Sequence, residues 1–187
     1  MSQPMSPALA AIVKSGQYRE YQDQTPELYS LDAAAKARTR ILELGAIAKI
    51  MNLATVGPDN WPLTSALPFV TVADQAERPV YYVFAPADGQ DVGNVKRDPR
   101  ASLTMDDSLE PGRDRDARAI QIRALAEIVD DAQQWAEAVS ALRAKSGSLA
   151  DTFTRATHAL IRVDALRVMV YDVKIRPAFG SVDYFQQ

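Results

Sequence analysis

The 187-residue chain contains no cysteine and only one histidine, His158. The absence of cysteine excludes disulfides, thiolate metal sites and a cysteine nucleophile. With one histidine, a metal site would need oxygen ligands throughout, and no EF-hand-like spacing is present, so no metal site is predicted. A lone histidine at the start of a predicted strand is more often structural than catalytic, and any haem ligation by histidine would have to use it.

An excess of positive charge and long apolar runs are also absent. The net charge is −3 at pH 7, so no general attraction to nucleic acid or to anionic membranes is expected. No apolar run approaches the roughly 18 residues that span a bilayer, and the start of the chain lacks the basic region of a signal peptide. We therefore expect a cytoplasmic protein that contacts neither membrane nor nucleic acid.

Motifs of common catalytic sites are missing too. The chain has no Gly-x-Ser-x-Gly, Walker or dinucleotide-binding motif, so no catalytic residue is predicted. Hydrophobic residues make up 47% and charged residues 24%, which is ordinary for a globular protein of one domain. Residues 1–29 are weakly periodic and are predicted to form an arm, and 30–187 are predicted to form a single domain.

The patterning predicts a mainly β protein. Good helix formers fill 32–44, and Gly45 follows where a helix often ends in a left-handed residue. Strands are predicted at 49–56, 63–72, 80–84, 100–105, 119–128 and 159–173, with helices at 91–97 and 131–143 and an irregular tail at 176–187. Pro68 indicates an edge or a bulge within its strand. Six strands with segregated helices favour a six-stranded antiparallel barrel with peripheral helices.

Several phrases of the sequence resemble the FMN-binding split β-barrel superfamily, whose best-known members are pyridoxamine 5'-phosphate oxidases. They are Leu53-Ala54-Thr55 before a turn, Pro62 and Ser65 after it, Tyr81-Tyr82-Val83-Phe84, and Asn94 before Asp98-Pro99-Arg100-Ala101-Ser102-Leu103-Thr104. Within the superfamily, the CREG-like and haem-utilisation branches are the most similar. The first shares the phrase Pro99 to Met105, and the second shares the Asp-Pro-Arg-Ala-Ser-Leu wording.

The resemblance implies a split β-barrel homodimer, with FMN between the subunits. It implies that Ser65, Ala66 and Leu67 meet the flavin ring. It also implies that the phosphate end is lined by Phe84, Ala85, Gln90, Asp91 and Asn94. The corresponding function is an FMN-dependent oxidoreductase with weak or atypical flavin binding. The alternatives are a CREG-like dimeric binding module without flavin and a haem-binding or haem-utilisation protein.

Weak flavin binding is expected because of the residues that surround the flavin phosphate. Relatives place basic residues at the start of the helix 91–97, where this chain has Gln90 and Asp91. Losing two charge-assisted hydrogen bonds costs about 1.5–3 kcal/mol each, and a carboxylate about 4 Å from the phosphate adds about 1–4 kcal/mol of repulsion. Rescue could come from Lys96, Arg97 or Arg100. The alternative is that Asp91 caps the helix and that these basic residues are surface residues.

Two other groups have a functional and a structural interpretation. Tyr81, Tyr82 and Phe84 could stack on a planar ligand, but aromatic residues more often form cores and interfaces. The acidic residues between Asp106 and Arg118 could bind a cation weakly, but interleaved arginines favour a self-paired solvated loop.

Overall fold

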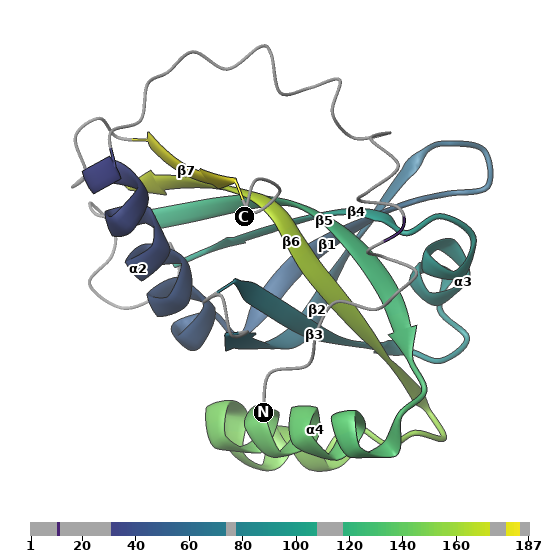
Figure 1. The fold of residues 1–187 in the computed structure, drawn as a ribbon. Coiled ribbons are helices and arrows are strands. Elements are labelled where there is room, and N and C mark those ends of the chain that lie inside the picture. Colours follow the sequence, from purple (N-terminus) through teal and green to yellow (C-terminus); the bar gives the residue numbers. More distant parts are fainter. Residues whose placement is uncertain (1–10, 12–30, 74–77, 108–117, 173–178, 184–187) are drawn as a thin grey trace.

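The computed structural model describes residues 11, 31–73, 78–107, 118–172 and 179–183, and shows an antiparallel barrel (Figure 1). The barrel strands are β1 (Ile50–Val56), β2 (Pro62–Ala73), β3 (Pro79–Pro86), β4 (Arg100–Asp106), β5 (Arg118–Val129) and β6 (His158–Asp172). Their order is β3-β2-β1-β4-β5-β6, and pairing of β3 with β6 closes the barrel. The predicted six-stranded split β-barrel is therefore confirmed.

A seventh strand, β7 (Phe179–Asp183), pairs with β6 outside the closed barrel. The sequence prediction of an irregular tail was wrong here. The segment contains Gly180 and Ser181 and lacks an alternation of apolar and polar residues, so its own pattern does not favour a strand. Instead, β6 runs past β3 and leaves backbone groups that β7 satisfies.

Two long strands, β2 and β6, each change pairing partner along their length. β2 pairs with β1 from Pro62 to Pro68 and with β3 from Phe69 to Ala73. Pro68 thus lies where the strand changes partner, which agrees with the predicted edge position. On β6, Leu166 is an unpaired extra residue between the segment that pairs with β3 and the segment that pairs with β7. Such a bulge bends the strand and lets it turn from one neighbour to the other.

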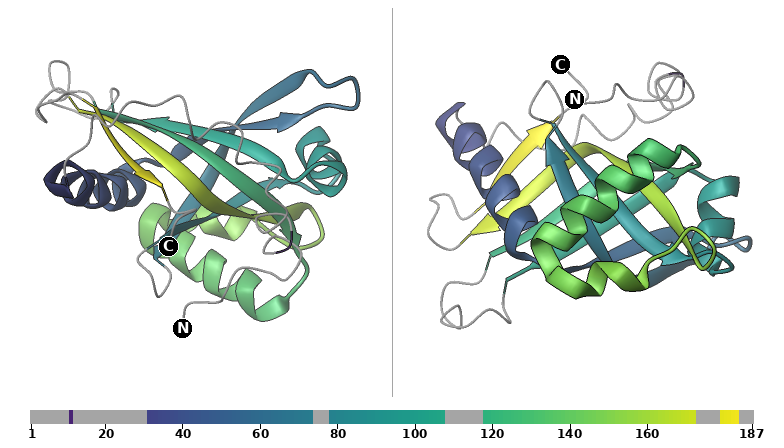
Figure 2. Two further views of the ribbon diagram at one scale, coloured as in Figure 1. Left: turned by 45° about the horizontal axis from the view of Figure 1, so that its top comes forward. Right: turned by 90° about the horizontal axis from the view of Figure 1, so that it is seen from below.

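In the part of the chain that the structure describes, α-helices surround the barrel (Figures 1 and 2). α2 (Leu31–Ile47) and α3 (Gln90–Arg97) lie at opposite ends, and α4 (Ala132–Ser146) runs along the outside, followed by the 3-10 helix η2 (Gly147–Thr152). None of the described helices is both long and apolar enough to cross a membrane.

Two apolar clusters hold these parts together. The larger fills the barrel, where the predicted alternation of β5 is confirmed, and α2 and α3 contribute to it at the two ends. Its α3 members are Val92 and Val95, and its α2 members include Ile41 and Leu44. The smaller lies between α4 and the outer side of β3, where Trp135 and Leu142 of the predicted helix stripe pack.

α2 extends beyond its predicted end. The helix continues through Gly45 to Ile47, so Gly45 does not end it. A Cβ at Gly45 would lie 2.6 Å from Oγ1 of Thr71. The glycine is therefore explained by the close approach of α2 to β2. In contrast, Gly147 does end α4 with φ of 61°, and the Asp131 carboxylate caps the start of α4 by accepting from the Gln134 amide at 2.7 Å.

Candidate functional site

Five of the eight predicted flavin residues lie on either side of the place where β2 and β3 separate. The ladder between these strands ends at the pair Phe69–Val83. Ser65, Ala66 and Leu67 come before this point on β2 and pair only with β1. Phe84 and Ala85 come after it on β3 and pair with β6. The two predicted groups therefore border the split of the barrel from opposite strands.

The side chains of these five residues differ in their exposure to solvent. Ser65 is half-buried, Ala66 is exposed and Leu67 is buried. Phe84 is 1% exposed and packs edge-on against Trp135, with 5.8 Å between ring centroids. Ala85 lies in the barrel core. Only Ser65 and Ala66 of these five present a side chain to solvent, so most of them could contact a ligand through the backbone alone.

The neighbouring aromatic residues belong to the cores. Tyr81 is fully buried and contacts Phe69, with ring centroids 6.2 Å apart. Tyr82 is buried below α4, where its hydroxyl donates to Oε1 of Gln134 at 3.3 Å. Burial raises the pKa of the Tyr82 hydroxyl. The structural interpretation of Tyr81, Tyr82 and Phe84 therefore holds.

Helix α3 starts directly after this strand. Its N-cap is Gly89, which has no side chain to cap the first turn. Gln90 is exposed. The interpretation of Asp91 as the helix cap was wrong, because Gly89 takes that position. Asp91 lies two residues further on, in the first turn, and its side chain is buried.

Asp91 and Asn94 join a buried polar cluster with Thr55 of β1. The Thr55 hydroxyl donates to Oδ1 of Asp91 at 3.2 Å, and Nδ2 of Asn94 donates to the Thr55 hydroxyl at 3.0 Å. Asp91 and Asn94 are each 5% exposed, and Thr55 is 1% exposed. The cluster fixes α3 on β1. Sequence reasoning missed Thr55, although its place in the Leu-Ala-Thr phrase was a signal.

The basic residues of α3 are directed away from its start. Lys96 and Arg97 lie in the last turn. Arg97 donates to the Val56 carbonyl and, at 3.3 Å, to Oδ1 of Asn94. Arg100 donates to both carboxylate oxygens of Asp98, and this bonding lowers the pKa of the Asp98 carboxyl. Arg97 and Arg100 are thus held in other contacts, which removes two of the three rescuing cations considered above.

Other buried charges are paired. Arg118 donates to Asp107 through Nε at 2.8 Å and contacts Glu43 at 2.9 Å. Arg162 forms two bonds of 2.9 Å with Asp164. The Asp107–Arg118 pair agrees with a self-paired loop, but residues 108–117 lie outside the described part of the chain. Among the described residues, no group of three or more acidic or histidine side chains could hold a metal ion.

His158 begins β6 and packs against an aromatic ring. Its ring lies 4.8 Å from that of Phe153 and its Nδ1 lies 2.9 Å from the Thr157 hydroxyl. The imidazole is thus held by the hydrogen bond at Nδ1 and by the edge-type contact with the Phe153 ring. The arrangement fits a structural histidine.

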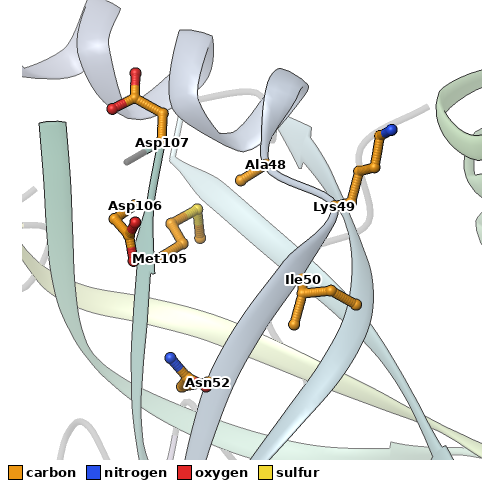
Figure 3. Close-up of a pocket in the computed structure, with 7 residues that line it drawn as sticks. All are labelled: Ala48, Lys49, Ile50, Asn52, Met105, Asp106 and Asp107. Atoms are coloured by element: carbon orange, nitrogen blue, oxygen red, sulfur yellow. The ribbon is translucent and has the colours of Figure 1, made fainter. Parts of the chain in front are cut away.

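A pocket of about 390 Å³ lies at the other end of β1, between β1 and β4 (Figure 3). Its lining residues are Ala48, Lys49, Ile50, Asn52, Met105, Asp106 and Asp107. Figure 3 shows the β1 side chains on one side and the β4 side chains on the other, with the Lys49 ammonium pointing away from them. This pocket was not predicted from the sequence, because its residues come from β1, β4 and the segments that flank them, which are more than 50 residues apart.

The match to a known family agrees with this geometry. The family model of pyridoxamine 5'-phosphate oxidase matches residues 31–175. The chain belongs to the pyridoxamine 5'-phosphate oxidase family. No curated protein matches the sequence. The superfamily resemblance drawn from the motifs is thereby confirmed.

Several solved structures of the superfamily have the same fold. The heme storage protein HutZ from Vibrio cholerae is 24% identical, with a TM-score of 0.54 over 68% of this chain and 88% of that chain. ChuZ from Campylobacter jejuni is 11% identical, with a TM-score of 0.64 over 98% and 70%. A FAD-binding protein from Mesorhizobium loti is 17% identical, with a TM-score of 0.54 over 78% and 93%. At these identities the likeness extends to the fold.

Proposed function

We propose that the protein is an FMN-binding oxidoreductase of the split-barrel type that holds its flavin weakly or in an atypical way. The observation that carries the proposal is the position of Ser65–Leu67 and Phe84–Ala85 on the two strands that border the split. Membership of the pyridoxamine 5'-phosphate oxidase family supports flavin chemistry. One solved relative, the Mesorhizobium loti protein, is described as FAD-binding.

FMN fits the ring end of this site better than the phosphate end. The exposed Ala66 and the half-buried Ser65 leave the β2 backbone accessible to a planar ring. At the phosphate end, the helix start offers N–H groups and a partial positive charge. However, the buried Asp91 carboxylate lies in the first turn of the same helix. When bound, FMN would supply hydride and electron transfer, while the chain would position the ring.

The charge at Asp91 is the reason to expect weak binding. Its carboxylate already accepts from Thr55, so it cannot swing away without removing the acceptor of the Thr55 hydroxyl proton. A carboxylate about 4 Å from a phosphate costs about 1–4 kcal/mol, or about five-fold to several hundred-fold in affinity. The same observation favours the second candidate, a CREG-like binding module that has no flavin.

A homodimer remains part of the proposal, on the strength of the family resemblance. Size-exclusion chromatography with light scattering should give twice the chain mass of 20.5 kDa. A mass of one chain would contradict the dimer and would also remove the subunit groove in which relatives hold the flavin.

The flavin proposal can be tested by absorbance. We expect the protein, mixed with excess FMN and passed through a desalting column, to lose most of its flavin bands. Equilibrium titration at higher protein concentration should still detect binding. Full retention of the flavin would contradict weak binding. No binding in either experiment would favour the module without flavin.

Haem binding is a further candidate, because two of the solved relatives are haem proteins by name. HutZ is a heme storage protein, and a Mycobacterium smegmatis relative with a TM-score of 0.60 is a heme binding protein. If haem binds through histidine, a Soret band should appear and should be lost in His158→Ala. A band that survives this substitution would exclude His158 as the ligand.

A further inference from the structure

The turn that joins β1 to β2 presents an exposed tryptophan. Trp61 is 73% exposed, the largest fraction among the exposed large hydrophobic side chains of the described residues. It joins neither of the two apolar clusters that hold the fold together. Tryptophan is enriched where proteins bind other molecules, because it offers a large flat apolar surface. The side chain is therefore a candidate binding residue.

The turn holds the backbone of Trp61 in a fixed position. The Gly57 amide donates to the Trp61 carbonyl at 2.7 Å, and the Asn60 amide donates to the Gly57 carbonyl at 3.0 Å. Oδ1 of Asp59 accepts from the Trp61 amide at 3.2 Å. Asn60 has φ of 63°, a left-handed conformation that asparagine adopts more readily than most residues. Three hydrogen bonds thus fix the residue that carries the indole.

α3 fixes the base of the same hairpin. Arg97, in the last turn of α3, donates to the carbonyl of Val56, the last residue of β1. The hairpin projects from the barrel beside α3, as Figures 1 and 2 show. Because the hairpin is held at its base and within its turn, Trp61 has a defined position relative to the barrel.

Trp61 lies on the same face of the hairpin as Ser65 of the proposed flavin site. The bond between Gly57 and Trp61 extends the β1–β2 ladder by one pair. Residues two apart along a strand share a face, so Trp61, Leu63 and Ser65 form one stripe. Leu63 and Ser65 are half-buried. At about 3.4 Å per residue, the backbones of Trp61 and Ser65 are about 14 Å apart, so the indole lies beside the proposed ring position.

The cross-strand neighbour leaves the indole accessible. That neighbour is Gly57, which has no side chain to cover the ring. A Cβ at Gly57 would lie 2.9 Å from Oδ1 of Asp59 and 2.9 Å from the carbonyl oxygen of Trp61, so the turn requires glycine here. Asp59 is exposed and places a negative charge close to the indole. A flat ring without negative charge suits this position.

We propose that Trp61 binds the substrate of the flavin enzyme and that this substrate is a planar aromatic molecule without negative charge. One part of the substrate stacks on the indole, and the other part reaches toward the flavin ring at 65–67. Stacked aromatic rings attract each other beyond the effect of buried area, and the Asp59 carboxylate disfavours anions. The reaction rests on the proposed function, whereas the contact with Trp61 does not.

Equilibrium dialysis with menadione, an uncharged two-ring quinone, tests this contact with and without FMN. The chain has no cysteine with which the quinone could react. We expect Trp61→Ala to weaken menadione binding by about fivefold or more, and Trp61→Phe to stay within about twofold of the wild type. Leu149→Ala is the matched control, because Leu149 is an exposed apolar residue on η2, and it should bind like the wild type. The anionic two-ring compound 1-naphthoate should bind the wild type more weakly than menadione.

Fluorescence gives a second readout, because the chain has two tryptophans and the other, Trp135, is buried. Menadione should quench the emission of the wild type more than the emission of Trp61→Phe. Equal quenching of the two proteins would contradict the contact.

Three further results would overturn the substrate site. One is equal menadione affinity in Trp61→Ala and the wild type. Another is an equal loss of affinity in Leu149→Ala. The third is a smaller oligomer in Trp61→Ala, which would assign the indole to a contact between copies of the chain.

FMN titration of the same proteins separates this inference from the proposed function. FMN binding that is equal in the wild type and Trp61→Ala, together with menadione binding that does not depend on Trp61, would overturn the inference and leave the flavin function intact. Menadione binding through Trp61 in a protein that does not bind FMN would contradict the flavin function and support the indole contact.

Discussion

Gly45 is a residue whose role is decided by a neighbour far along the chain. Its carbonyl accepts hydrogen bonds from the Thr71 hydroxyl at 3.4 Å and from Nζ of Lys145 at 2.9 Å. Three elements, α2, β2 and α4, therefore meet at one peptide group. A side chain at position 45 would have to enter the space that Thr71 occupies.

Gly45→Ala should destabilise the protein. The new methyl group would lie within 3.3 Å of three atoms of Thr71, a β-branched residue with little freedom to move. Overpacking of this kind costs about 1–3 kcal/mol, which exceeds or offsets the roughly 1 kcal/mol gained in helix propensity. Gly93→Ala is the control, because no atom lies within 4 Å of its added Cβ. Urea unfolding should show the control as stable as the wild type or more stable, and an equally stable Gly45→Ala would contradict the close approach.

Lys145 links stability to pH. Its ammonium also donates to the Phe69 carbonyl at 3.2 Å and lies 3.6 Å from the centroid of the Phe69 ring. Burial lowers the pKa of Lys145 from 10.5 to about 8. The folded state then binds fewer protons than the unfolded state between these pH values, so the free energy of unfolding should rise as the pH increases from about 8 to about 10.5.

Lys145→Met isolates this contribution. Urea unfolding of both proteins at several pH values between 7 and 10 should show the wild type gaining stability relative to the variant as the pH rises. The opposite trend would mean that the two carbonyls and the Phe69 ring favour the charged amine more than burial disfavours it.

At the scale of the elements, α3 is positioned by polar contacts as much as by apolar ones. Val92 and Val95 enter the barrel core, while Asp91 and Asn94 are hydrogen-bonded to Thr55. A short helix gains little stability from its own backbone bonds, so these tertiary contacts hold it.

Thr55→Val should loosen α3. The substitution keeps the shape of the side chain but removes the group that serves both Asp91 and Asn94, at a cost of about 1–3 kcal/mol for each buried polar group left unpaired. Thr64→Val is the matched control, since Thr64 is exposed on β2. Hydrogen exchange should show faster exchange of α3 amides in Thr55→Val alone. Equal protection in both variants would show that the apolar contacts suffice.

The sequence predicted the elements whose signal is local. The alternation of β5, the stripe of α4 and the Asp131 cap are all read from neighbouring residues, and each is confirmed. The role of Gly45 and the existence of β7 were not predicted, because the first is explained by a contact with Thr71 and the second by the unpaired part of β6, both distant in the sequence. In the same way, the sequence placed Asp91 at the cap, whereas its partner Thr55 is 36 residues away.

At the scale of the whole molecule, the barrel brings together residues that a motif search lists separately. Closure through β3 and β6 places the predicted ring-contacting residues on one border of the split and Phe84 and Ala85 of the predicted phosphate end on the other. Asp91, which was predicted to line the phosphate end or to cap the helix, belongs to a buried polar cluster. The family fold is thus retained, while one end of the proposed flavin site carries the wrong charge for a phosphate.

The affinity of Asp91→Asn for FMN is the most direct test of this account. Asparagine keeps an oxygen that can accept from Thr55 but removes the negative charge. Flavin fluorescence titration should show that Asp91→Asn binds FMN at least about five-fold more tightly than the wild type, since the repulsion removed is about 1–4 kcal/mol. Asp151→Asn, an exposed residue paired with Arg143, should leave the affinity unchanged. If Asp91→Asn binds FMN no more tightly than the wild type, the Asp91 charge does not limit flavin binding and the proposed site is contradicted.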